Sequence, residues 1–350
     1  MPNPLGIYTP YKFCDLTMAM LSLADQLRHR GNMVSLLSQT ANAPCVGSYW
    51  DTHRLKYRKN WTAWGKARRL ILWGFCPPTA VLEWAGKQGL VNILVADGSN
   101  IDENCKDAIP RFSVVVAPFR TTAINLNSYY GAKARDVPWS FSLPLISKRQ
   151  PIRGKVKLFF PLWDRVVENT PQTVLETIRH CCRQDFQVTV AYTPSLWLSA
   201  VKRRLSELDA EFSNLRLLRS PRFGERHSLL AEHHLTVLPS NTEFYWTTPL
   251  LSLWAGTPVL GYKLPTFEEF LTEDNSILLN CELCYNRVGM AQATPDRHTL
   301  HAALTTRNLT PSRLALLQQQ CQAGLPERQD SFVKRWQEFL LPLQSSGDLL

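Results

Sequence analysis

The sequence predicts an α/β protein made of two successive domains, each built on a parallel sheet. The length of 350 residues is the first indication, because domains typically hold about 100–200 residues. The second is composition: 45% hydrophobic residues, with 15 Phe, 11 Trp and 10 Tyr, supply two cores and exclude a disordered chain. The third is the alternation of short apolar runs with helix-like stretches along the whole chain.

The first half opens with a βαβ pattern. A strand, a helix and a second strand are expected at residues 5–8, 16–27 and 33–37, and Gly31 ends the helix. Each further strand of this half is a short apolar run that ends in polar or small residues, and these runs lie at residues 69–73, 91–96 and 112–117. We therefore assign residues 1–150 to an N-terminal domain.

A second alternating series follows a connecting segment at residues 143–155, which is rich in Pro, Lys and Arg. Its strands are expected at residues 156–160, 187–192, 215–218, 235–238 and 259–261. Its helices are expected at residues 170–182, 195–208, 225–232 and 250–255. Residues 151–325 are assigned to a C-terminal domain, and residues 326–350 to a closing helical segment that we expect to pack back toward the N-terminal domain.

The formal net charge of +10 is concentrated in the first half. Residues 1–150 hold 18 Lys and Arg against 9 Asp and Glu, which leaves 21 basic and 20 acidic residues of the totals of 39 and 29 for the rest. The balance is therefore +9 in the first half and +1 in the second. The excess gathers in a basic aromatic segment, residues 54–69, that holds Arg54, Lys56, Tyr57, Arg58, Lys59, Trp61, Trp64, Lys66, Arg68 and Arg69.

The basic aromatic segment has two interpretations. Its cations could hold phosphates while its aromatic faces stack on unpaired bases, as in nucleic-acid grooves. Alternatively it is a solvated helix that turns Trp61, Trp64 and Leu72 inward, since these residues fall near helical spacing. A positive electrostatic field attracts anionic partners, so the excess of positive charge in the first half keeps the nucleic-acid interpretation open.

The cysteines and the start of the sequence are used to predict the cellular compartment. Nine irregularly spaced cysteines in a chain of this size predict reduced thiols. Cys281 and Cys284 form a lone CxxC with no second pair at zinc spacing, so we expect buried thiols and assign no metal. Because the sequence has no apolar run of about 18 residues and no basic flank before an apolar stretch at its start, we expect a soluble cytoplasmic protein.

The most informative loop follows the expected strand at residues 235–238. A polar loop runs from Ser240 to Glu243, and a helix is expected to begin at Thr247 or Thr248. The start of a helix offers main-chain N–H groups and the positive end of a dipole to a phosphate. A carboxylate such as that of Glu243 accepts hydrogen bonds from hydroxyls. This pattern is typical of a site for a phosphorylated, hydroxyl-rich ligand.

These residues resemble those of the GT-B nucleotide-sugar glycosyltransferases, particularly glycosyltransferase family 4. The shared motifs are Leu238-Pro239-Ser240, Glu243 and Gly256-Thr257-Pro258-Val259, with looser similarity over residues 156–279. In the first domain only the opening strand, loop and helix are similar. The resemblance implies two Rossmann-like domains whose parallel sheets face a central cleft. It also implies a nucleotide-sugar co-substrate, expected to be UDP-linked, and no tightly bound cofactor.

The resemblance also implies a donor site in the second domain. Glu243 would contact the hydroxyls of the donor sugar and act in catalysis, and main-chain amides at residues 244–247 would approach the sugar and diphosphate. Arg165 would neutralise the diphosphate leaving group. The donor-binding residues expected on this basis are Arg165, Arg222, Phe223, Ser240, Asn241, Phe244, Tyr245, Trp246 and Thr247.

The sequence departs from the family pattern at two places. The second acid, eight positions after Glu243, is replaced by Leu251, or by Ser252 in a neighbouring alignment, so the usual ribose contact is missing. Aromatic residues at positions 244–246 replace the glycines that usually follow the first acid. Glu243 could therefore be an exposed loop acid beside core aromatics, and Arg165 could form a surface pair with Glu168.

Acceptor activation is assigned to the first domain. Asp97 follows an apolar run and begins the strand-end loop Asp97-Gly98-Ser99-Asn100, so its carboxylate could take the acceptor proton or orient the acceptor. Such a loop also suits an Asx turn or a helix cap. His53 is a second candidate base. The acceptor-binding residues expected are Tyr11, Lys12, His53, Arg54, Lys56, Arg58, Lys59, Trp61, Lys66, Arg68 and Arg69.

Together these features predict a monomeric hexosyl- or N-acetylhexosaminyl-type glycosyltransferase with a nucleic-acid acceptor. The acceptor proposed from sequence is the hydroxymethyl group of 5-hydroxymethylcytosine in DNA, as in viral (phage) DNA-modifying enzymes, which would act in the host cytoplasm. A base in a duplex must be flipped out, which requires cations and an apolar wedge. The alternatives are a lipid or lipopolysaccharide acceptor, with residues 61–72 as an amphipathic membrane-surface helix, and an inactive nucleic-acid-binding GT-B protein.

Overall fold

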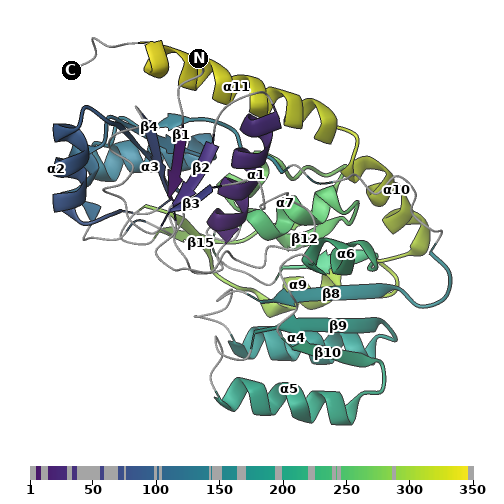
Figure 1. The fold of residues 1–350 in the computed structure, drawn as a ribbon. Coiled ribbons are helices and arrows are strands. Elements are labelled where there is room, and N and C mark those ends of the chain that lie inside the picture. Colours follow the sequence, from purple (N-terminus) through teal and green to yellow (C-terminus); the bar gives the residue numbers. More distant parts are fainter. Residues whose placement is uncertain are drawn as a thin grey trace. The chain divides into compact units, whose positions relative to one another are not determined.

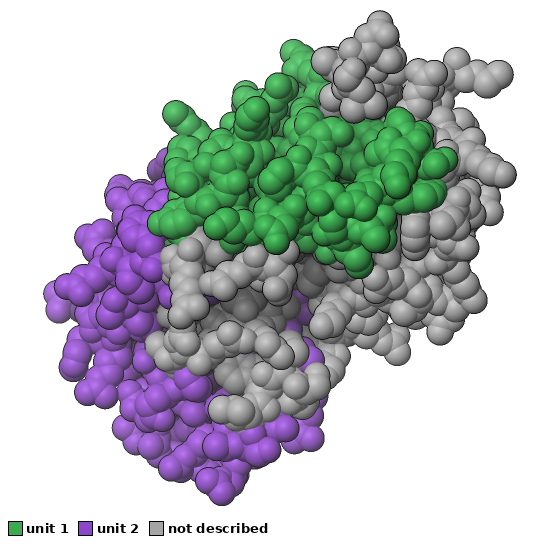
Figure 2. Space-filling view, turned by 90° about the vertical axis from the view of Figure 1, so that its left-hand side faces the viewer, with its two compact units in different colours: residues 1–142, 286–290, 326–350 green, residues 143–285, 291–325 purple. Residues whose placement is uncertain are grey.

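The structure is a computed structural model of residues 1–350. It describes all of these residues except 1–4, 9–14, 30–33, 38–55, 59–69, 75, 98–100, 102–104, 142, 144–151, 164–170, 194–198, 220–224, 239–241, 243–245, 286–288 and 346–350. The chain forms two compact units, coloured separately in Figure 2. The first unit holds residues 1–142, 286–290 and 326–350, and the second holds residues 143–285 and 291–325.

The described part of the first unit contains a seven-stranded sheet in the order β3-β2-β1-β4-β5-β6-β7. All neighbouring strands are parallel. The strands are β1 Leu5–Tyr8, β2 Val34–Leu37, β3 Lys56–Arg58, β4 Leu70–Trp73, β5 Val91–Val95, β6 Val114–Ala117 and β7 Arg135–Asp136. The helices are α1 Asp15–His29, α2 Thr79–Lys87 and α3 Arg120–Tyr130, with a 3₁₀ turn at Ile109–Arg111 (Figure 1).

Strands β4, β5 and β6 form the centre of this core because they are apolar on both faces. Nearly every residue of the three strands is buried, as expected for parallel strands covered on two sides. Asn92 is the polar exception, and its amide is satisfied: Trp73 Nε1 donates to Asn92 Oδ1 at 2.9 Å, and Asn92 Nδ2 donates to the Leu90 carbonyl at 3.2 Å. Tight central packing holds the carboxyl ends of these strands in place.

The interpretation of residues 61–72 as a helix is wrong over its last turn. Leu70–Trp73 form strand β4, and all four side chains are at most 2% exposed. Four consecutive apolar residues suit a strand buried on both faces but leave a surface helix without a polar side. The proposed amphipathic membrane-surface helix loses the same turn. Lys56–Arg58 form the edge strand β3, which the sequence did not predict.

Helix α11, Leu325–Ser345, belongs to the first unit from Pro326 onward. Its side chains enclose Trp139, which is fully buried. The Phe332 ring lies 5.8 Å from the Trp139 ring and the Trp336 ring lies 5.4 Å away edge-on, while Arg328 Nε donates to the Trp139 carbonyl at 3.4 Å. An aromatic cluster therefore joins the end of the sequence to the first sheet's unit.

The described part of the second unit contains a six-stranded parallel sheet in the order β10-β9-β8-β11-β12-β13. Its strands are β8 Lys157–Leu162, β9 Gln187–Tyr192, β10 Leu215–Arg219, β11 Leu235–Val237, β12 Val259–Tyr262 and β13 Ser276–Leu279. A hairpin adds β14 Leu283–Tyr285 and β15 Ala291–Ala293. The helices are α4 Pro171–Arg183, α5 Ser199–Glu211, α6 Arg226–Ala231, α7 Thr247–Trp254, α8 Pro265–Glu268, α9 Arg297–Ala303 and α10 Pro311–Cys321.

The two sheets share one strand order. In each, the chain starts at a central strand, moves outward to one edge and then returns to build the other side. The direction reverses between β1 and β4 in the first sheet and between β8 and β11 in the second. Helices α4 and α5 pack against β9 and β10, and α7 packs against β12 (Figure 1). The predicted α/β class with two parallel sheets is confirmed, and ligands of such sheets bind where the order reverses, at the carboxyl ends.

The expectation that the CxxC cysteines are buried is wrong for Cys284. It lies on β14, where all three residues are exposed, because this strand pairs on one side only in a two-stranded hairpin. Within the described ranges no disulfide forms and no group of three or more metal-binding side chains gathers. The helices that the structure describes include none that is both long and apolar enough to span a bilayer.

His233, just before β11, is a buried imidazole at 4% exposure. Its ring lies 4.7 Å from that of Phe159, and Nδ1 donates to the Leu229 carbonyl at 2.6 Å. Burial lowers the pKa of His233 to about 4, and the nearby positive charges of Lys157 and Arg216 act in the same direction. The imidazole is therefore neutral at physiological pH.

This histidine is expected to make stability depend on pH. Above about pH 6.5 both the folded and the unfolded chain hold it neutral, so it has no effect. Between about pH 6.5 and 4 the unfolded chain binds a proton that the folded chain does not, so the free energy of unfolding falls, by up to about 3 kcal/mol. Urea unfolding at a series of pH values would measure this slope, and His233→Phe should flatten it. An equal slope in both proteins would contradict the assignment.

Candidate functional site at the carboxyl edge of the second sheet

The loops of the expected donor site leave from neighbouring strands. Strands β8 and β11 pair directly, with Leu158 opposite Leu235 and Phe159 opposite Thr236, and the chain order reverses between them. Residues 164–170, with Arg165, follow β8, and residues 239–245 follow β11. Arg165, Arg222, Phe223, Ser240, Asn241, Glu243, Phe244 and Tyr245 lie outside the described residues. The topology thus starts the two main donor loops side by side at the position where such sheets bind ligands.

The expected acceptor residues are described only in part. Asp97 lies two residues beyond the end of β5, and its side chain is 2% exposed. Lys56 and Arg58 lie in edge strand β3. Tyr11, Lys12, His53, Arg54, Lys59, Trp61, Lys66, Arg68 and Arg69 lie outside the described residues. Of the proposed acceptor residues, the structure therefore describes Asp97 and the two basic residues of β3.

Helix α7 begins at Thr247, as the sequence predicts. The side chains of Trp246 and Thr247 are buried, at 0% and 2% exposure, and in the described residues no side chain caps this helix start. Pro249 in the first turn has no N–H to offer. This helix start can therefore offer an anion its main-chain N–H groups and the positive end of the helix dipole.

A cluster that the sequence did not reveal surrounds Trp163, the residue after β8. Trp163 is 1% exposed, its Nε1 donates to Thr248 Oγ1 in the first turn of α7 at 3.2 Å, and its carbonyl accepts from Thr193 Oγ1 at 2.9 Å. The guanidinium carbon of Arg226, the first residue of α6, lies 4.6 Å from the centre of the Trp163 ring. We call these four residues the Trp163 cluster. It joins the ends of β8 and β9 to the starts of α6 and α7.

Arg226 places a buried positive charge in this cluster. Its exposure is 7%, and desolvating a guanidinium costs several kcal/mol unless its surroundings compensate. The electron-rich face of Trp163 supplies part of the compensation through a cation–π contact. Because Trp163 also hydrogen-bonds the start of α7, the cation and the positive end of that helix belong to one region.

The positions of the missing second acid are part of the core. Leu251 is 3% exposed and Ser252 is 0% exposed, both within α7. The Ser252 hydroxyl bonds to Thr236 Oγ1 at 2.7 Å and donates to the Thr257 carbonyl at 2.8 Å, and Thr257 Oγ1 donates to the Leu230 carbonyl at 2.7 Å. This network fixes α7 against β11 and α6. The helix face at these positions serves packing, so a ribose contact would have to come from other residues.

Restoring the family acid is expected to damage the fold rather than improve ligand binding. Leu251→Glu would put a carboxylate at a 3% exposed position, and a buried unpaired charge costs several kcal/mol. Leu251→Met conserves volume and should change the free energy of unfolding by about 1 kcal/mol or less. Chemical unfolding of the two variants tests this. A stable Leu251→Glu protein with tighter nucleotide binding would show that this position faces a ligand.

Strand β15 contacts one residue of the segment between β11 and α7. Thr242 forms an isolated antiparallel bridge with Gln292 of β15 and is 7% exposed. The residue directly before Glu243 is therefore held by a sheet-like contact. This contact could not be predicted from the sequence, because β14 and β15 are each three residues long, too short for a strand pattern to be recognised.

Solved structures with the same architecture match nearly the whole chain. A glycosyltransferase from Rickettsia africae superposes with a TM-score of 0.72 at 10% identity and covers 99% of this chain and 100% of its own. Anabaena HepE, in complex with UDP and glucose, gives 0.72 at 14% identity with the same coverage. The catalytic domain of Arabidopsis starch synthase IV, bound to ADP and acarbose, gives 0.66 at 12% identity and covers 98% and 99%.

These likenesses establish the fold. The chain has the two-domain α/β architecture of the GT-B glycosyltransferases. No protein-family model and no curated protein sequence matches it. The comparison therefore shows which architecture this sequence adopts, whereas activity and ligands must be argued from its own residues.

Proposed function

We propose that this protein is a glycosyltransferase whose second domain binds a nucleotide sugar, with UDP as the nucleotide. The observation that carries the proposal is the Trp163 cluster, which places a buried cation and the start of α7 at the reversal point of the second sheet. A diphosphate is the ligand chemistry that this electrostatic arrangement suits. UDP is the nucleotide bound by the structurally similar HepE, and ADP the one bound by the similar starch synthase domain.

The Trp163 cluster also suits the chemistry of transfer. When the bond between the sugar and the diphosphate breaks, negative charge develops on the departing oxygen. A guanidinium fixed on an indole face is already oriented, so it stabilises that charge without costly rearrangement. Glu243, next to the held residue Thr242, would accept hydrogen bonds from the donor sugar. Asp97 at the end of β5 would take the proton from the acceptor hydroxyl or orient the acceptor.

For the acceptor we propose the hydroxymethyl group of 5-hydroxymethylcytosine in DNA, and for the sugar a hexose or an N-acetylhexosamine. The support is the charge of +9 in residues 1–150 against +1 in the rest, together with the aromatic side chains of the basic aromatic segment. For a lipid acceptor, the membrane-surface helix would have to exclude residues 70–72, which belong to the buried strand β4. An inactive nucleic-acid-binding protein is the competing proposal, favoured by the buried positions 251 and 252.

Mass spectrometry of nucleosides would test both parts of the proposal. Duplex DNA with and without 5-hydroxymethylcytosine would be incubated with the protein and a mixture of nucleotide sugars. A mass gain of one hexose or N-acetylhexosamine on the modified base alone is the expected result. Consumption of donor without DNA modification would retain the glycosyltransferase and reject the DNA acceptor. Tight, salt-sensitive DNA binding with intact donors would identify the inactive protein.

Variants in each domain would test the donor site and the DNA-binding segment separately. Glu243→Ala should abolish transfer and leave DNA affinity nearly unchanged. Replacing Arg58, Lys59, Arg68 and Arg69 with Gln should weaken DNA binding and flatten its dependence on salt, because fewer counterions are released. Equal loss of both activities in Glu243→Ala would indicate misfolding instead of a donor-site defect.

A further inference from the structure

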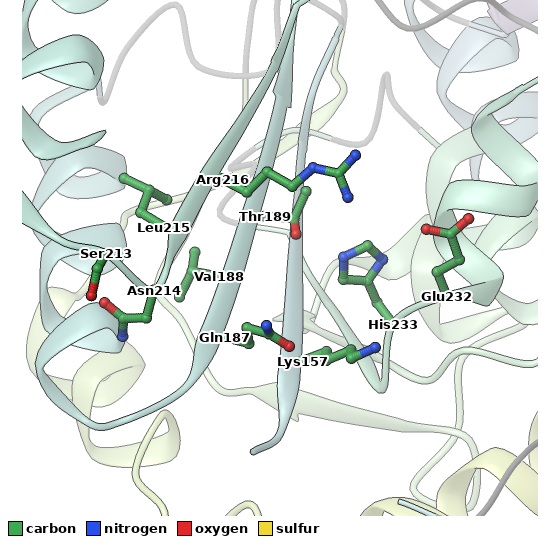
Figure 3. Close-up of a pocket in the computed structure, with 10 residues that line it drawn as sticks. All are labelled: Lys157, Gln187, Val188, Thr189, Ser213, Asn214, Leu215, Arg216, Glu232 and His233. Atoms are coloured by element: carbon green, nitrogen blue, oxygen red, sulfur yellow. The ribbon is translucent and has the colours of Figure 1, made fainter. Parts of the chain in front are cut away.

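A pocket lies at the edge of the second sheet opposite the carboxyl ends, where the strands begin. Its volume is about 180 Å³, and it is lined by the first residues of three strands, Lys157 of β8, Gln187 of β9 and Leu215 of β10. Val188, Thr189, Ser213, Asn214, Arg216, Glu232 and His233 complete the lining (Figure 3). Parallel strands place these amino-terminal ends away from the carboxyl-edge loops of the donor site. The pocket is therefore a separate site on the second domain.

The charges around this pocket are unbalanced in favour of cations. Arg216 extends from β10 past Thr189 toward the His233 imidazole, and Lys157 lies below that ring in the view of Figure 3. The positive charges of Lys157 and Arg216 lie near enough to help lower the pKa of His233, although burial of the ring is the main cause. Glu232 lies on the other side of the imidazole (Figure 3). Within the described residues neither Lys157 nor Arg216 forms a side-chain ion pair.

The neutral parts of the lining add hydrogen-bonding groups on a fixed frame. Thr189 is 7% exposed and lies below the Arg216 side chain in the view of Figure 3, with its hydroxyl oxygen on the side away from the guanidinium. Asn214 is held by two hydrogen bonds, because its Nδ2 donates to the carbonyls of Cys182 and Phe186, both at 2.8 Å. At about 30 Å³ for each water, the volume accepts a phosphate group with a few attached atoms or waters.

We propose that this pocket binds a phosphate group, either free phosphate or the phosphate of a small phosphomonoester, through Lys157 and Arg216. The fork of the Arg216 guanidinium can hold two phosphate oxygens, and Lys157 contributes a point charge on the other side. This site is independent of the proposed transfer reaction, since it uses none of the donor-loop residues. A bound phosphate would tie the starts of β8, β9 and β10 together.

Calorimetric titration of the full chain with sodium phosphate, against sodium chloride at equal ionic strength, would test the proposal. Saturating UDP would occupy the donor site, and UDP-free titrations would run in parallel. The expected result is millimolar phosphate binding that persists with UDP and weakens about ten-fold or more in Arg216→Gln and in Lys157→Gln. Arg203→Gln, an exposed charge change on α5 of the same domain, is the matched control and should bind as the native protein does.

The outcomes are distinct. Glycerol 3-phosphate binding with the same losses would identify phosphomonoesters as the ligand class, whereas binding of phosphate alone would identify the free ion. Unchanged affinity in Arg216→Gln, or the absence of phosphate binding by the native chain at millimolar concentration, would overturn the proposal. Because Lys157 and Arg216 are exposed, we expect both variants to unfold in chloride at the same temperature as the native protein. This measurement is the control that both variants fold.

Discussion

Replacement of Arg226 by methionine is expected to reduce kcat/KM for sugar transfer by about 100-fold or more. Removing one fixed group that stabilises developing charge typically costs 10²–10³ in rate, and Arg226 is such a group if the diphosphate binds at the Trp163 cluster. Methionine fills much of the same volume without the charge. Transfer rates with a range of donor concentrations would measure kcat and KM separately.

Three companion measurements identify the cause of this loss. Arg226→Lys keeps the charge but loses the planar contact with Trp163, so it should retain part of the activity. Trp163→Phe removes the hydrogen bond to Thr248 and should weaken UDP binding less than Arg226→Met does. If Arg226→Met binds UDP as tightly as the native chain does and transfers sugar at the same rate, the diphosphate binds elsewhere. The absence of UDP binding by the native chain would reject the nucleotide-sugar site itself.

Trp139→Ala is expected to lower the free energy of unfolding by about 3–5 kcal/mol. The side chain is fully buried between Phe332 and Trp336 of α11, and its removal leaves a cavity that this aromatic cluster cannot close. Helix α11 should then detach from the first unit more readily. Chemical unfolding would measure the loss, and limited proteolysis would show faster cleavage within residues 326–345.

A matched control distinguishes packing of α11 from general damage. Trp84→Ala removes an indole of intermediate exposure from α2 and should cost clearly less, since a partly exposed site leaves a smaller cavity. Trp139→Phe should keep most of the contact with the Phe332 ring. If Trp139→Ala and Trp84→Ala lowered stability equally, the α11 contact would have little energetic importance.

Strongly apolar strands could be predicted from the sequence because burial on both faces leaves a simple pattern. The strand at residues 187–192 is predicted with its exact bounds, and β4, β5 and β8 agree within two residues. The missed strands, β3, β7, β13, β14 and β15, are all short, with two to four residues each. β7 is Arg-Asp, and β14 is exposed along its whole length, so pairing with a neighbour rather than composition makes them strands.

The candidate site could be predicted only where its residues are adjacent in the sequence. Glu243 and the start of α7 belong to one continuous motif, and the structure places that helix start at Thr247. Trp163 and Arg226 meet because β8 is a central strand and α6 leads into its neighbour β11, a relation that no local pattern contains. Similarly, the missing acid is visible in the sequence, but the burial of Leu251 and Ser252 depends on the packing of α7.

The discontinuous make-up of the first unit has a consequence for synthesis on the ribosome. Residues 291–325 of the second unit emerge before the α11 side chains that cover Trp139, so the second unit can fold first although its sequence starts later. The nascent first unit meanwhile exposes the apolar surface around Trp139. Translation of the α11 region is therefore the step at which the first unit closes, and slow synthesis there would prolong the exposure of an aggregation-prone surface.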